Sequence, residues 1–260
     1  MKHLNELVER EKLMTRVELF DDNGLIAVQG PKSPAVLQEV FTDVDFSQIP
    51  FMSYFKSKFE GDEYVITRSG YTGEDGFEIA GNPSQIVKIT ERLLKNPVLQ
   101  WAGLGSRDSL RLEAGLCLHG HDMTPEITPL EATLMWTVFK RKDDSKRMKF
   151  IGEDALKELQ EKVKAKQTSI KKRVGFIVEE PGIIRENCEI IDANDKKVGH
   201  TSSGSYSPSL KKSIGMAYVD QELSKEGTKL FAVQRGKKHK IGIVKMPFVA
   251  SGYYKGWKDF

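Results

Sequence analysis

The chain has 260 residues, of which 39% are hydrophobic and 30% are charged, an ordinary composition for a globular protein with a substantial core. Its 40 Lys and Arg residues outnumber its 37 Asp and Glu residues by three, an excess too small to indicate binding to nucleic acid or to a membrane surface. The two cysteines, Cys117 and Cys188, lack the spacing of a zinc or redox pair, which favours a reducing compartment.

The first 16 residues alternate apolar and charged positions, a pattern that predicts an amphipathic helix. The acidic residues Glu6, Glu9 and Glu11 are atypical of a transit peptide, and no apolar core follows the positive start as a secretory signal requires. No targeting peptide is therefore visible. No apolar run along the chain is long enough to span a bilayer.

The next segments alternate between strand and helix patterns. Residues 25–29 predict a strand closed by Gly30 and Pro31, and Ser33 with Pro34 predicts the start of a helix. Residues 55–68 predict a β-hairpin that turns at Gly61 and Asp62. A short strand at 77–79 precedes a helix that we expect to begin at Ser84 and to reach Lys95, and a further helix is expected over 106–114, ended by Gly115.

The composition changes after a charged helix predicted over 153–166. From residue 171 onward, short alternating runs separated by Gly, Asn and Asp predict strands only. The sequence therefore predicts an α+β region over residues 1–160 and a small β-barrel domain over residues 161–260.

Residues 69–78 form a glycine-rich segment, with three glycines among them. The spacing fits neither a P-loop nor a dinucleotide-binding fingerprint, so the segment is either a plain turn between strands or a ligand-binding loop. The second interpretation singles out Tyr71 and Glu78. A glutamate in an otherwise apolar strand needs a partner, and a carboxylate accepts paired hydrogen bonds from an amidine-like edge such as that of a reduced pterin.

Three further segments have two interpretations each. Arg107, in the first turn of its helix, opposes the helix dipole and has either a ligand or the neighbouring Asp108 as its partner. The His119-Gly120-His121-Asp122 run lacks further ligands for a metal, which favours a polar loop.

The hydroxyl-rich run over 201–212 predicts a loop. Its Lys211 and Lys212 form either a basic face for an acidic partner, together with Lys237, Lys238 and Lys240, or an ordinary solvated surface.

The C-terminal segment over 245–255 is unusually aromatic for a chain end. Chain ends without a role are usually polar and disordered, so we expect this one to pack on the body of the protein. A tyrosine there presents both a ring and a hydroxyl to a ligand.

Together these segments resemble the aminomethyltransferase family, the T-proteins of the glycine cleavage system. The resemblance rests on seven stretches spread in family order along the chain: residues 29–31, 70–79, 107–122, 127–131, 173–176, 201–219 and 245–254. The Gly-Tyr-Thr-Gly-Glu run is also similar to the folate domains of dimethylglycine and sarcosine dehydrogenases, but no flavin signature accompanies it. The Ser-Tyr-Ser-Pro-Ser-Leu-Lys-Lys run resembles the T-protein more narrowly.

The resemblance implies interlocked folate-binding α+β domains and a reaction with tetrahydrofolate. An aminomethyl group on the dihydrolipoyl arm of the H-protein passes to tetrahydrofolate as a methylene group, and ammonia leaves. By match to the family motifs, the expected folate contacts are Tyr71, Glu78, Arg107, Trp136 and Tyr253. Glu78 is expected on the pterin edge, and Lys211 with Lys212 at the carrier. The family needs no metal, acts as a monomer, and is mitochondrial in eukaryotes and cytoplasmic in bacteria.

The chain departs from the family pattern in one respect. The family's catalytic aspartate lies in a Gly-Gly-Ile-Leu-Asp-Asp motif that this sequence does not contain. We therefore expect an N-terminally truncated member with no catalytic residue among those present, from a source in which the mitochondrial matrix is the favoured compartment. The alternative is an inactive truncated paralogue that binds only folate or the H-protein.

Overall fold

The computed structural model describes residues 1–139 and 149–256. The chain divides into two compact units. The sheet unit comprises Met1–Gly70, Glu74–Trp101 and the chain from Gly252 onward. The barrel unit comprises Tyr71–Gly73 and Ala102–Ser251. The short Tyr71–Gly73 segment of the glycine-rich run thus belongs to the barrel unit, and the domain boundary expected at residue 160 stays a prediction.

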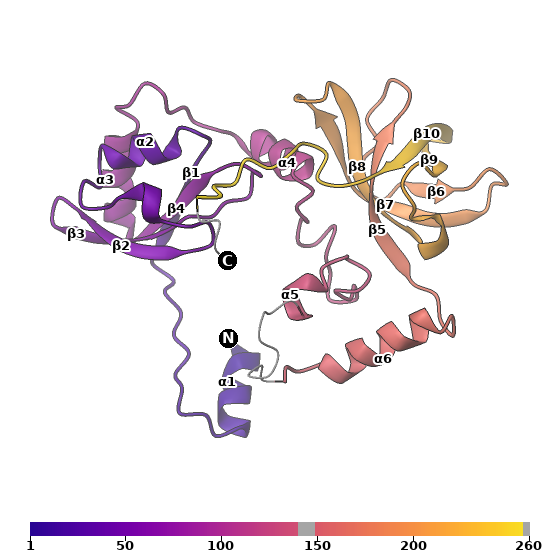
Figure 1. Ribbon diagram of the computed structural model, residues 1–260, viewed down its shortest axis with the longest axis horizontal. Helices are drawn as coiled ribbons and strands as arrows, with labels where there is room; N and C mark the ends of the chain where they lie inside the picture. The colour runs from indigo at the N-terminus through magenta and orange to yellow at the C-terminus, as the bar shows by residue number, and fades with distance from the viewer. Residues whose placement is uncertain (140–148, 257–260) are drawn as a thin grey trace. The chain divides into compact units, whose positions relative to one another are not determined.

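The sheet unit holds a four-stranded antiparallel sheet in the order β1-β4-β3-β2. Its elements are α1 (Lys2–Arg10), β1 (Gly24–Gln29), α2 (Ser33–Gln38), η1 (Phe46–Gln48), β2 (Tyr54–Phe59), β3 (Asp62–Thr67), β4 (Gly76–Gly81) and α3 (Pro83–Leu93). Helices α2 and α3 pack against the sheet (Figure 1). The core between them includes the fully buried Leu37, Ile66, Phe77, Ile79 and Ile89, which come from strands and helices alike.

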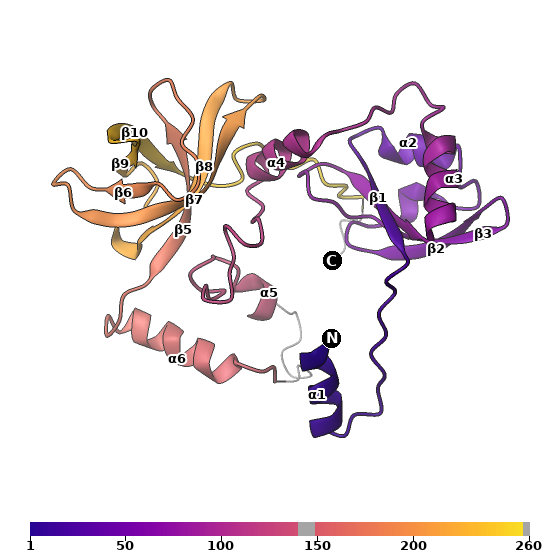
Figure 2. The same ribbon diagram turned by 180° about the vertical axis from the view of Figure 1, so that it is seen from behind.

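The barrel unit contains a closed six-stranded barrel in the order β10-β5-β8-β7-β6-β9, which Figure 2 shows from the side opposite to Figure 1. Its elements are α4 (Leu104–Glu113), α5 (Trp136–Phe139), α6 (Glu153–Lys164), β5 (Lys171–Val178), β6 (Glu189–Ile191), β7 (Lys197–Ser207), β8 (Lys212–Asp220), η3 (Gln221–Leu223), β9 (Lys229–Gln234) and β10 (Lys237–Val244). Closure leaves no free sheet edge, which protects the strands from pairing with another chain.

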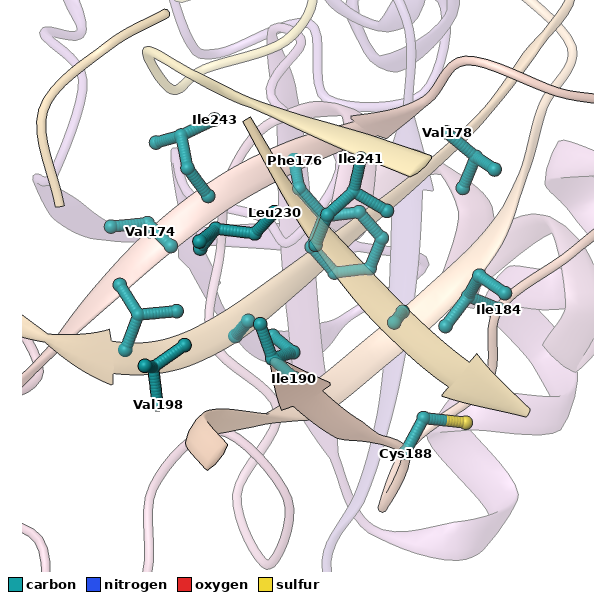
Figure 3. Close-up of a cluster of buried hydrophobic side chains, with 13 residues drawn as sticks. Val174, Phe176, Val178, Ile184, Cys188, Ile190, Val198, Leu230, Ile241 and Ile243 are labelled. Carbon is teal, nitrogen blue, oxygen red and sulfur yellow. The ribbon is translucent and has the colours of Figure 1, made fainter. Parts of the chain in front are cut away.

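Branched aliphatic side chains fill the inside of the barrel. Figure 3 shows Val174, Phe176, Leu230, Ile241 and Ile243 gathered between the strands, where none is more than slightly exposed. Val174 and Phe176 of β5, like Ile241 and Ile243 of β10, stand two positions apart, the period-two pattern that predicts a strand with one buried face. The α+β composition and the C-terminal barrel predicted from the sequence are therefore confirmed.

Several element ends differ from the sequence prediction for identifiable reasons. The hairpin turns at Glu60 and Gly61, both with positive φ (48° and 86°), and Asp62 already begins β3. Helix α3 begins at Pro83 because Asn82, rather than Ser84, accepts the N–H of Gln85 while the Gln85 side chain accepts the N–H of Asn82. Helix α1 ends at Arg10, six residues before the predicted end.

The hydroxyl-rich run over 201–212 is mostly strand, so its prediction as a loop was wrong. Strand β7 continues to Ser207 before the chain turns into β8. Hydroxyl groups favour turns only when they bond the local backbone. Here Ser202 and Ser203 donate to Asp122, and Ser207 donates to Glu113, all far away in the sequence.

Within residues 1–139 and 149–256, no helix combines the length and the apolar character needed to cross a membrane. The aromatic C-terminal segment packs on the protein as expected. Phe248 joins Leu112, Ile214 and Met216 in a small apolar cluster of the barrel unit, and the N–H groups of Phe248 and Val249 donate to the carbonyl of Glu113.

Candidate functional site

Tyr71 and Arg107, far apart in the sequence, lie against each other in the barrel unit. The guanidinium carbon of Arg107 is 4.7 Å from the centre of the Tyr71 ring. The Tyr71 hydroxyl donates to the carbonyl of Cys117. Burial raises the pKa of the Tyr71 phenol, so it keeps its proton at neutral pH. Asp108, the alternative partner for Arg107, instead accepts two hydrogen bonds from Arg111, at 2.9 and 2.7 Å.

A glycine makes this approach of the loop to α4 possible. Gly73 has a φ of +76°, and a Cβ added to it would lie 2.6 Å from the Cβ of Ala114. Any other residue would therefore meet both backbone strain and a steric clash at this position. The glycine-rich segment is thus shaped by its packing against the end of α4 and is more than a turn between strands.

A cavity of about 710 Å³ in the barrel unit adjoins Tyr71. Trp136, the first residue of α5, also lines it and is 62% exposed, and Leu116, Cys117, Arg173 and Met246 form other parts of its wall. Its volume falls within the roughly 300–1,000 Å³ typical of small-molecule sites. Burial raises the pKa of the Cys117 thiol, so this side chain contributes a neutral, weakly polar surface and no thiolate nucleophile.

A buried polar cluster, the Asp122 cluster, lies between α4 and the barrel. Asp122 is fully buried and accepts hydrogen bonds from Arg111 Nη1 at 2.8 Å, from Ser202 Oγ at 2.5 Å and from Ser203 Oγ at 2.8 Å. It also accepts the N–H of Leu118, next to the Cys117 carbonyl that receives the Tyr71 hydroxyl. The His119–Asp122 run is therefore more than a polar loop, because its last residue joins α4, the following loop and β7.

Glu113 makes a second buried connection between α4 and the barrel. Its carboxylate accepts hydrogen bonds from Ser207 Oγ at 2.5 Å and from Ser209 Oγ at 2.7 Å. Ser207 ends β7 and Ser209 lies in the turn to β8, whose first residue is Lys212; both Lys211 and Lys212 are exposed. Glu113 therefore fixes the turn that presents the two lysines.

Glu78 and Tyr253 belong to the sheet unit. Glu78 is half-buried in β4, opposite Ala27 of β1 and Thr67 of β3, and its Oε2 accepts the Ser69 hydroxyl at 2.5 Å. The Tyr253 ring stacks on Phe51 with 4.2 Å between ring centres. Burial raises the pKa of the Tyr253 phenol.

The structure thus brings Tyr71 together with Arg107 by direct contact, and with Trp136 around one cavity. Glu78 and Tyr253 belong to the sheet unit. Among residues 1–139 and 149–256, no group of three or more His, Cys, Asp or Glu side chains is arranged to hold a metal ion. Sequence reasoning missed Asp122, Glu113 and Arg68, whose partners are distant in the sequence.

Two family models match the chain in succession. The model described as GCVT N-terminal domain matches residues 1–142, and the model described as glycine cleavage T-protein C-terminal barrel domain matches residues 171–250. The chain belongs to the glycine cleavage T-protein family. Tyr71, Glu78, Arg107 and Trp136 lie within the first match, Lys211 and Lys212 lie within the second, and Tyr253 lies beyond both.

Relatives with the same family name cover most of the chain. The mitochondrial aminomethyltransferase of Dictyostelium discoideum is 39% identical over 98% of this chain, and that of Pisum sativum is 42% identical over 91%. The human mitochondrial aminomethyltransferase is 41% identical over 90% of this chain. The crystal structure of the glycine cleavage system aminomethyltransferase T from Bartonella henselae superposes on 97% of the chain with a TM-score of 0.81 and 36% identity.

The chain is shorter than these T-protein relatives. It spans 64% of the Dictyostelium protein, 56% of the pea and human proteins, and 67% of the Bartonella chain. The family resemblance seen in the sequence is confirmed by both family models.

Proposed function

We propose that this T-protein family member acts as an aminomethyltransferase of the glycine cleavage system. It would accept the aminomethyl group carried on the lipoyl arm of the H-protein, pass its methylene carbon to tetrahydrofolate, and release ammonia. The observation that carries the proposal is the match of both family domains in order, over 1–142 and 171–250. The mitochondrial relatives extend the proposal to a location in the mitochondrial matrix, which subcellular fractionation of the source cells would test.

A single-turnover assay tests the reaction. The purified chain is mixed with tetrahydrofolate and with H-protein that carries the aminomethyl-lipoyl group, and ammonia and methylenetetrahydrofolate are measured. Equal formation of both products supports the proposal. Binding of tetrahydrofolate without either product would contradict catalysis by the chain and favour a role in binding alone.

We propose Tyr71, Glu78, Arg107, Trp136 and Tyr253 as the residues that contact folate. Three features of the barrel unit support the assignment. The protonated Tyr71 stacks under Arg107, whose planar guanidinium suits carbonyl or carboxylate acceptors of folate, and Trp136 offers an exposed aromatic surface on the same cavity as Tyr71. No group of this pocket requires a metal ion for these contacts.

Glu78 is proposed as the partner of the pterin edge. A carboxylate pairs with an amidine-like edge through two parallel hydrogen bonds, in the same geometry as an Arg–carboxylate pair. The Ser69 hydroxyl, which itself lies 2.7 Å from the Thr67 hydroxyl, donates to one Glu78 oxygen and orients the carboxylate. An oriented carboxylate loses less conformational freedom on binding.

We expect Glu78→Ala to abolish measurable binding of tetrahydrofolate. Each hydrogen bond to a charged group contributes about 1.5–3 kcal/mol, or roughly 10–150-fold in affinity, and Glu78→Ala removes both bonds of the proposed pair. Calorimetric titration under reducing conditions measures the change. The matched control is Glu63→Ala, which removes an exposed carboxylate from the neighbouring strand β3 and should leave the affinity unchanged. Undiminished affinity in Glu78→Ala would show that the pterin edge binds elsewhere.

Lys211 and Lys212 are proposed as contacts for the H-protein. Reversal of both charges (Lys211→Glu with Lys212→Glu) should weaken H-protein binding by roughly three- to tenfold at low ionic strength, with a smaller loss at physiological ionic strength because salt screens exposed charges. Biolayer interferometry with immobilised H-protein measures both values. The control pair Lys196→Glu with Lys197→Glu changes the same charge on another exposed turn. Equal losses of affinity in the two double variants would show that only the net charge of the protein matters, and would contradict the docking role of Lys211 and Lys212.

A further inference from the structure

The C-terminal segment ends on the sheet unit through three successive residues. Gly252 forms a β-bridge with Glu74. The next residue, Tyr253, stacks its ring on Phe51 at an interplanar angle of 28°. The Tyr254 hydroxyl then donates to the carbonyl of Ser47 at 2.8 Å. All three contacts are made within the sheet unit.

Tyr254 also covers a buried cation. The guanidinium carbon of Arg68 lies 3.7 Å from the centre of the Tyr254 ring, and Arg68 is 1% exposed. Arg68 is held in place by Asp75, whose two carboxylate oxygens accept from Nε at 2.9 Å and from Nη2 at 2.6 Å. A cation–π contact is stronger at such a desolvated site than at an exposed one, so the contact with Arg68 fixes the position of the Tyr254 ring.

Arg68 also holds the segment that contains Phe51, the residue on which Tyr253 stacks. Its Nη1 donates to the carbonyls of Phe46 and Ile49, at 2.7 and 2.6 Å. Its backbone carbonyl accepts the N–H of Met52 at 2.9 Å. Residues 46–52, which include Phe51, are therefore tied to Arg68 at three points, and the Ser47 carbonyl within them is tied to Tyr254.

These contacts fix Tyr253 from two sides. Phe51, on one side, belongs to the segment that Arg68 shapes, and Tyr254, the next residue along the chain, is seated on Arg68 itself. A ring held in this way pays little conformational entropy when a ligand packs against it, whereas an untethered chain end must first be ordered.

We propose that Tyr254 is a positioning residue for folate binding. The packing of the Tyr254 ring on Arg68 restricts the motion of the neighbouring Tyr253 ring. This inference rests on the proposed role of Tyr253 as a folate contact. A purely structural role for Tyr254 would stabilise the chain end without changing how folate binds, and the two roles are separable by experiment.

The test compares Tyr254→Ala, Tyr254→Phe, Tyr253→Ala and the double alanine variant in the full chain. Tetrahydrofolate affinity is measured by calorimetry, and the rate of chymotryptic cleavage after residue 253 is measured by mass spectrometry in Tyr254→Ala, Tyr254→Phe and the unmodified chain. We expect Tyr254→Ala to weaken tetrahydrofolate binding by about tenfold and to speed cleavage. Tyr254→Phe keeps the ring on Arg68 and should restore most of the affinity and protection. The double variant should bind no more weakly than Tyr253→Ala, because Tyr254 acts through Tyr253.

Two results would overturn the proposal in distinguishable ways. If Tyr253→Ala weakens binding and Tyr254→Ala does not, Tyr253 contacts folate but needs no positioning by Tyr254. If neither variant changes the affinity while Glu78→Ala abolishes it, the folate site stands without Tyr253 and the positioning role is lost with that contact. If Glu78→Ala has no effect either, folate binds away from all the assigned contacts. Failure of the proposed folate function itself would instead appear as no binding of tetrahydrofolate by the unmodified chain. The cleavage rate reports in each case whether Tyr254 anchors the chain end.

Discussion

Replacement of Asp122 by alanine should lower the free energy of unfolding of the barrel unit by about 3–5 kcal/mol. The Asp122 carboxylate is fully buried, and the Arg111 side chain with which it pairs is 3% exposed. Without Asp122, the buried Arg111 would keep only the partly exposed Asp108 as an anionic partner. The donors of Ser202, Ser203 and Leu118 would also lose a buried acceptor. Removal of one partner from a buried ion pair therefore costs more than the pair contributes when both are present.

The same variant should disturb the proposed folate pocket. Asp122 accepts the N–H of Leu118, and the adjacent carbonyl of Cys117 receives the Tyr71 hydroxyl. Once the loop is released, Tyr71 loses a fixed acceptor and the contact between Tyr71 and Arg107 loses its support. We therefore expect weaker tetrahydrofolate binding together with the lower stability.

Asp108→Ala is the matched control because Asp108 also pairs with Arg111. The Asp108 side chain is 44% exposed, so its loss should cost only about 0.2–1 kcal/mol. Because the chain has two units, global unfolding need not be two-state, and hydrogen exchange of peptides from β7 and β8 gives the local value. A loss for Asp122→Ala no larger than that for Asp108→Ala would show that Arg111 does not depend on the buried carboxylate.

The elements that the sequence predicted well are those whose signal is local. The strand over 25–29 and the strands of the barrel follow from period-two alternation, and the observed β1 agrees with the prediction to within one residue at each end. The end of α4 follows from Gly115, whose φ of +71° is a conformation that glycine adopts most easily. Such signals lie within a few residues of the element that they define.

The elements that the sequence predicted poorly depend on distant partners. The three residues of α4 that are buried are Arg111, Leu112 and Glu113, so two charged side chains face inward and hydrophobic periodicity cannot locate the packed face. Their partners, such as Ser203 and Ser207, lie on β7. The sequence signal for these pairs is the presence of acidic residues in and just after α4 together with a hydroxyl-rich strand. Which acid meets which hydroxyl is decided only when the chain folds.

The same contrast between local signals and distant partners holds for the candidate site. Residue type and the family motifs singled out Tyr71 and Arg107, but the stacking of one on the other joins segments that no spacing rule connects. Glu78 was singled out by its chemistry, as a carboxylate in an apolar strand, and the Ser69 contact supplies the partner that such a residue needs.

Arg68→Ala should lower the free energy of unfolding of the sheet unit by about 3–5 kcal/mol, because it leaves the buried carboxylate of Asp75 without its cation. The loss extends to the carbonyls of Phe46 and Ile49, which would no longer receive the Nη1 donor. Arg68→Lys keeps the charge but cannot form the two parallel bonds to Asp75, so it should recover only part of the stability. The measurement is hydrogen exchange of peptides from β3 and β4.

Two further variants separate the buried pair from an ordinary surface pair. Lys56→Ala breaks the exposed ion pair with Glu63 on the same sheet and should lower the stability far less than Arg68→Ala, because solvent screens an exposed pair. The double variant Arg68→Met with Asp75→Leu removes both buried charges and should be more stable than Arg68→Ala, since no uncompensated charge remains. If the double variant is instead the less stable of the two, the uncompensated charge of Asp75 is not the main loss in Arg68→Ala. The stability would then rest on the bonds that Asp75 makes to its own loop, such as that from the Gly76 N–H.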